Sequence, residues 1–120
     1  MRLAMVAAGG ALGSAARWGV GLAWPHPAAT LAVNLIGCAV LGFVVEALST
    51  RHRLLRLFLG PGVLGGFTTF STYAVETRVL MADGRPGTAV AYALGTLVGA
   101  LTALSLGMLA ARPLTRRRAG

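Results

Sequence analysis

The chain has 120 residues, of which 56% are hydrophobic and only 12% are charged, and its formal net charge is +8. A soluble domain usually has about 25% charged residues to keep its surface in water, so this composition excludes an ordinary soluble domain and indicates a protein that lies in lipid. The length allows one domain, which we place at residues 1–120.

Four apolar stretches follow one another along the chain, at residues 3–23, 28–48, 57–82 and 88–111. A helix needs about 20 apolar residues to cross a hydrocarbon core of about 30 Å, so we predict an all-α protein with four transmembrane helices. The short connections make consecutive helices antiparallel neighbours. The start of the chain also resembles a signal peptide with a small-residue cleavage site, but the apolar run resumes after Arg17, and we interpret it as a membrane helix.

The connections carry most of the charge. An arginine-rich loop at residues 51–56 ends the second stretch, a tight turn at residues 83–87 ends the third, and Arg112-Pro113 ends the fourth. All 11 basic residues are arginines. Because they lie at the ends of apolar stretches, we interpret them as membrane-topology signals and expect no nucleic-acid partner.

Small residues recur four positions apart in two stretches. Gly9 and Gly13 form such a pair in the first stretch, and Gly95 and Gly99 form one in the fourth. This spacing predicts close helix–helix packing in a membrane. The single cysteine, Cys38, excludes an intrachain disulfide.

The third stretch breaks its own pattern at residues 65–73 (GGFTTFSTY), where paired glycines precede four Ser and Thr residues. Backbone that leaves a helix in lipid must have its N–H and C=O groups satisfied, and discontinuous membrane helices do so at ion-binding sites. We therefore predict an interruption within residues 65–69 that serves a function. The alternative is a simple glycine kink, with Ser and Thr bonding to the preceding turn.

Polar residues within the other spans are few. Asn34, Tyr92 and Thr96 stand out, and an intramembrane Asn can equally hold two helices together. Glu46 and Glu76 lie towards helix ends, whereas a proton-coupled exporter normally needs a carboxylate deep in the membrane. No Ser-His-Asp, Cys-His or metal-ligand cluster is present in the sequence, so we do not expect an enzyme.

Three motifs resemble the CrcB/Fluc family of fluoride channels. They are residues 9–18 (GGALGSAARW), residues 34–37 (NLIG), and residues 65–73 with Glu76 three positions later. The length, the four-span layout and the order of the motifs agree over the whole chain. One departure is Tyr73, where Phe is the more usual residue.

The resemblance implies an antiparallel dimer in the cell membrane that passively exports cytoplasmic fluoride and so lowers its toxicity. It also implies a structural sodium ion, which is not transported, held by the backbone carbonyls of Gly65 and Thr68. The fluoride pathway would be formed by Phe70, Tyr73, Asn34, Ser71, Thr72, Tyr92 and Thr96. Arg17 and Glu76 would act electrostatically or as anchors. The alternatives from other classes are a small multidrug-resistance-type exporter and a non-transporting membrane accessory subunit.

The arginines also predict an orientation. With four spans, one side carries eight of them, at positions 2, 51, 53, 56, 112, 116, 117 and 118, and the other side carries three, at positions 17, 78 and 85. Cytoplasmic loops are enriched in Arg, so we expect both termini in the cytoplasm. An antiparallel dimer would then form either with a second copy of the chain or with an oppositely oriented homologue.

Overall fold

The computed structural model describes residues 1–48 and 52–119, with side chains up to residue 117, and every regular element among them is a helix. The elements are α1 (Arg2–Ala23), α2 (Pro27–Ala47), α3 (Arg53–Leu57), the π-helix η2 (Phe58–Leu64), α4 (Gly65–Phe67), α5 (Ser71–Ala82) and α6 (Pro86–Ala119).

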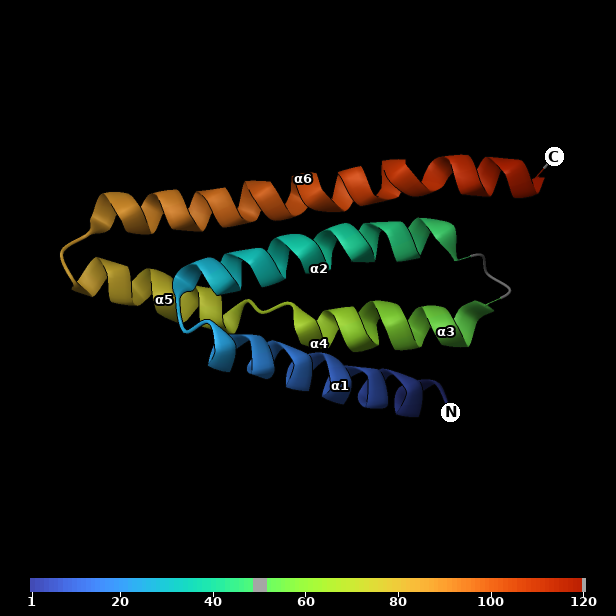
Figure 1. The fold of residues 1–120 in the computed structure, drawn as a ribbon, viewed down its shortest axis with the longest axis horizontal. Coiled ribbons are helices and arrows are strands. Elements are labelled where there is room, and N and C mark those ends of the chain that lie inside the picture. Colours follow the sequence, from blue (N-terminus) through green and yellow to red (C-terminus); the bar gives the residue numbers. More distant parts are fainter. Residues whose placement is uncertain (49–51, 120) are drawn as a thin grey trace.

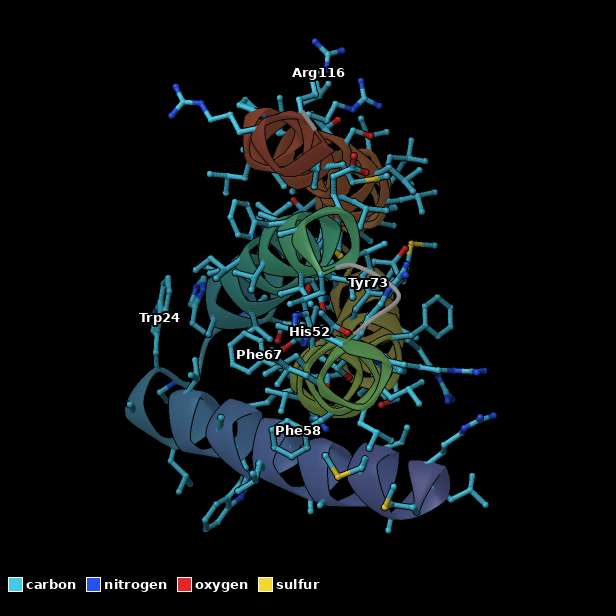
Figure 2. The ribbon with its side chains drawn as sticks, turned by 90° about the vertical axis from the view of Figure 1, so that its right-hand side faces the viewer. Trp24, His52, Phe58, Phe67, Tyr73 and Arg116 are labelled. Carbon is cyan, nitrogen blue, oxygen red and sulfur yellow. The ribbon has the colours of Figure 1, made fainter. Side chains whose placement is uncertain are left out.

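The helices lie side by side in an elongated arrangement of 56 × 29 × 21 Å (Figure 1). The end view in Figure 2 shows the order across the molecule: α6, then α2, then the third segment from α3 to α5, then α1. α1 packs mainly on η2 and α4, whereas α6 packs on α2 and α5. Both chain termini lie at one end, where α2 ends and α3 begins (Figure 1).

Three segments among the described residues are long and apolar enough to cross a membrane. They are Pro27–Ala47, with 21 residues, Arg53–Ala82, with 30 residues counted across α3 to α5, and Pro86–Arg117, with 32 residues. α1 has 22 residues and thus the length of a span, but it is not among the three.

Glycines allow the backbones of neighbouring helices to approach each other closely. A Cβ atom on Gly13 would overlap the carbonyl oxygen of Val63, and one on Gly107 would overlap the carbonyl oxygen of Ala39. Gly9 is equally confined, which confirms the close packing predicted for the first stretch. In the fourth stretch the prediction is correct for Gly99, which faces Leu35. It is wrong within the single chain for Gly95, which faces open space.

Two predicted helix boundaries are wrong. The fourth helix, α6, does not stop at residue 111 but continues through Pro113 to Ala119. Pro113 removes a single intrahelical hydrogen bond, and the Leu and Arg residues after it are good helix formers. The third segment begins at Arg53 rather than at residue 57, because the predicted arginine-rich loop forms the first turn of α3.

Candidate functional site

The third segment is interrupted between Phe67, where α4 ends, and Ser71, where α5 begins. Thr68 is extended, with φ −72° and ψ 154°, and the interruption is visible in Figure 1 as the thin stretch before α5. The paired glycines at 65 and 66 are themselves helical. The chain leaves the helix at the hydroxyl residues that follow, whose side chains compete with the backbone for hydrogen bonds.

The side-chain amide of Asn34 bridges this interruption. Its Nδ2 donates to the carbonyl oxygen of Thr69 at 3.0 Å, and its Oδ1 accepts from the Thr69 N–H at 2.8 Å. Asn34 is only 6% exposed. The amide therefore pairs with the opened backbone as another strand of backbone would, and α2 is tied to the break.

Thr69 organises the start of α5. Its Oγ1 accepts from the N–H of Thr72 at 3.2 Å and donates to the hydroxyl of Thr72 at 3.1 Å. A hydroxyl that accepts from an N–H in the first turn is the usual device for satisfying a helix N-terminus. Sequence reasoning did not single out Thr69, although a Thr three residues before that N–H is a recognisable capping signal.

Arg17 and Ser14 of α1 satisfy a second opened group. Arg17 Nε donates to the carbonyl oxygen of Gly66 at 3.2 Å, and the Ser14 hydroxyl donates to the same oxygen at 3.4 Å. The guanidinium of Arg17 thus lies against the interruption and brings a positive charge to it. This contact is compatible with both predicted roles of Arg17, the anchor and the electrostatic one.

The carbonyls of Gly65 and Thr68 have lost their helical donors. In an unbroken helix the N–H of Thr69 would donate to Gly65 and the N–H of Thr72 would donate to Thr68. The first N–H is bound to Asn34 and the second to the Thr69 hydroxyl. Both carbonyl oxygens thus lack the donors that an unbroken helix would give them, and Gly65 is exposed at the surface of the single chain.

A cavity of about 290 Å³ adjoins the interruption and gathers several of the predicted residues. Its lining includes Asn34, Cys38, Thr68, Thr69, Phe70, Tyr73 and Thr96. Thr96 is only 5% exposed, and its hydroxyl has no hydrogen-bond partner among the described residues. The rings of Phe70 and Tyr73 lie 5.5 Å apart at 54°, and Phe70 is 79% exposed. Thr96, Phe70 and Tyr73 therefore line one cavity, and the hydroxyl oxygen of Thr96 is buried.

Tyr73 differs from the more usual Phe by a hydroxyl, and this hydroxyl forms a hydrogen bond. The hydroxyl donates to the carbonyl oxygen of Ala93 on α6 at 3.2 Å, and the ring lies 5.8 Å from that of Tyr92. Tyr in place of Phe at position 73 thus adds a hydrogen bond between α5 and α6, while its ring still lines the cavity.

Other predicted residues lie outside this cavity. Tyr92 and Thr30 both donate to the carboxylate of Glu76, the latter at 2.9 Å, which ties α2, α5 and α6 together. A second cavity, of about 370 Å³, is lined by Arg17, Thr72 and Glu76, and Thr69 lines both cavities. Ser71 is exposed and lines neither. The predicted path residues thus fall on two sides of the interruption, and sequence reasoning missed Thr30.

Residues 4–108 match the family described as CrcB-like protein, Camphor Resistance (CrcB). A protein of Streptomyces coelicolor named fluoride-specific ion channel FluC 1 is 50% identical over 124 residues, which cover 97% of this chain and 80% of the relative. One of Thermobifida fusca named fluoride-specific ion channel FluC 2 is 50% identical, with coverages of 86% and 82%. One of Paracoccus denitrificans named fluoride-specific ion channel FluC is 44% identical, with coverages of 91% and 93%.

Proposed function

The chain belongs to the CrcB family of membrane proteins, and from this premise we propose that it is a fluoride-selective channel. It would let fluoride leave the cytoplasm passively and so lower its concentration and toxicity. The observation that carries the proposal is the cavity beside the interrupted third segment, whose lining brings Thr96 of α6 together with Phe70 and Tyr73.

The groups around the cavity suit a small anion. Fluoride holds its water tightly, so a selective path must replace that water with donors in a narrow space. The buried hydroxyl of Thr96 has no partner among the described residues, and Asn34 keeps one amide hydrogen beyond the one it gives to Thr69. The edges of the rings of Phe70 and Tyr73 carry partial positive charge and can face an anion. Arg17 adds a full positive charge at the interruption.

The direct test is fluoride efflux from liposomes that contain the purified chain. A channel releases fluoride without a proton gradient, and Phe70→Ile, which keeps an apolar side chain but removes the ring, should slow release at least tenfold. An exporter of the multidrug-resistance type would need the gradient, and an accessory subunit would release nothing. Glu76 argues against the exporter, because two hydroxyls already bind its carboxylate.

Thr96→Val separates a functional from a structural role of the buried hydroxyl. The change keeps the shape and removes a group that has no partner among the described residues, so the thermal stability of the purified chain should stay equal or rise. If the hydroxyl binds fluoride in transit, efflux should fall about tenfold in the same variant. Unchanged efflux at unchanged stability would remove Thr96 from the pathway.

A structural sodium ion would be held by the carbonyls of Gly65 and Thr68, supported by the loss of their helical donors. Bound there, sodium supplies a fixed positive charge near the interruption. Two oxygens do not complete a cation site, so the remaining ligands would come from a second chain. Because Thr68 would bind sodium through its backbone carbonyl, Thr68→Ser should reduce fluoride efflux only slightly.

The assembly we propose is an antiparallel dimer of four-span subunits in the cell membrane, with α1 as the fourth span. The chain would insert mainly with both termini in the cytoplasm, since the end that holds both termini also holds Arg2, Arg53 and Arg116. Its partner is then an oppositely oriented homologue or, if insertion is mixed, a second copy.

Labelling decides the orientation. With Cys38→Ala as background, a cysteine at position 116 should react only with reagent on the cytoplasmic side. Equal labelling from both sides would exclude a fixed orientation, and efflux by the purified chain alone would exclude the need for a different partner.

A further inference from the structure

A third cavity lies far from the interruption, at the end of the molecule that holds both termini. It measures about 570 Å³ and is lined by Met1, Arg2 and Leu3 at the start of α1 and by Arg53 and Leu54 at the start of α3. α1 and α3 contact each other directly, so segments far apart in the sequence form the two walls (Figure 1). Nothing in the proposed fluoride pathway uses this cavity.

The lining combines positive charge with apolar surface. The side chains of Arg2 and Arg53 are both exposed, and Met1 and Leu3 are 87% and 86% exposed. Two guanidinium groups therefore stand beside side chains that water does not solvate well. This combination suits a ligand that has an anionic head and an apolar body.

The surroundings strengthen the positive charge. The same end carries further arginines at positions 56, 112, 116 and 117, against one acidic residue among the described residues, Glu46 in the last turn of α2. The chain has only three acidic residues in all, and two of them, Glu76 and Asp83, belong to α5 and its C-terminus. The cavity thus lies in a field that attracts anions.

We propose that this cavity binds the phosphate head group of an anionic phospholipid, with Arg2 and Arg53 on the phosphate and Leu3 and Leu54 against the glycerol and first acyl carbons. Guanidinium groups match phosphate geometry through paired N–H donors, and basic pockets between membrane helices bind anionic head groups. The cavity opens where the first and third segments begin, which is the level of the lipid head groups. A free phosphate ion would use the arginines and leave the apolar lining unused.

The test is the thermal unfolding of the purified full chain in a neutral detergent, titrated with short-chain phosphatidylglycerol. We expect the midpoint to rise with this lipid and not with phosphatidylcholine of the same chain length. Arg2→Gln with Arg53→Gln should raise the half-saturating lipid concentration about 25-fold, which is about fivefold for each arginine. Inorganic phosphate and glycerol 3-phosphate should have little effect.

The matched control is Arg116→Gln with Arg117→Gln, which removes the same charge at the same end from exposed positions on α6. It should leave the half-saturating concentration within about twofold. An equal loss in this control, or an equal response to phosphatidylcholine, would overturn the site. An equal response to inorganic phosphate would show that the cavity binds small anions and would overturn the assignment of a phospholipid as its ligand. If the double variant does not fold, Arg2→Gln and Arg53→Gln alone give the same comparison.

Discussion

Gly13→Leu should leave no folded protein. Gly13 is buried between α1 and η2, where a Cβ atom would overlap the carbonyl oxygen of Val63 and lie 2.8 Å from the backbone nitrogen of Phe67. Both obstacles are backbone, so no side chain can move aside, and α1 would have to separate from the third segment. Overpacking of this kind costs about 3 kcal/mol or more. The yield of monodisperse protein after detergent extraction and gel filtration measures the effect.

Two other glycines provide the controls. Gly95 has the same four-residue spacing on α6 but open space around it, so Gly95→Leu should fold with a normal yield. Gly65 meets only the carbonyl oxygen of Gly60, at 3.8 Å. Gly65→Leu should therefore fold as a single chain and lose fluoride efflux, because the added side chain would occupy the proposed sodium site and the dimer axis. A normal yield for Gly13→Leu would show that the helices pack differently.

Three of the four predicted membrane spans could be read from the sequence, because lipid demands long apolar helices. A membrane span must be apolar for about 20 residues, which leaves a pattern that is hard to miss. Boundaries outside the apolar core are less constrained. The continuation of α6 through Pro113 and the start of α3 at Arg53 both fall among arginines, which leave no hydropathy signal for a helix.

The contacts around the interruption could not be predicted from the sequence. The pairing of Asn34 with Thr69 joins residues 35 positions apart, and that of Thr30 with Glu76 joins residues 46 positions apart. Such pairs depend on how far each helix is rotated and shifted along its neighbour, which local pattern does not determine. The family motifs supply the candidate residues, and their roles in transport stay predictions. The geometry shows that Asn34 has a structural use that the sequence left as an equal alternative.

Asn34→Leu should destabilise the chain by about 2 to 6 kcal/mol. The substitution removes both hydrogen bonds to Thr69 and leaves the N–H and C=O groups of this half-buried residue without their side-chain partner, at about 1 to 3 kcal/mol for each group. Leu is close to Asn in size, so loss of packing contributes little. The midpoint of thermal unfolding in detergent, with the same lipid and sodium concentration for every variant, measures the effect.

Thr102→Val is the matched control, because it also replaces a polar side chain within a span. The hydroxyl of Thr102 donates only to the carbonyl of Val98 in its own helix and is exposed, so the variant should unfold within about 0.5 kcal/mol of the parent. A role for Asn34 confined to fluoride in transit would lower efflux and leave the unfolding midpoint unchanged. An Asn34→Leu variant as stable as Thr102→Val would therefore show that the amide does not hold the interruption together.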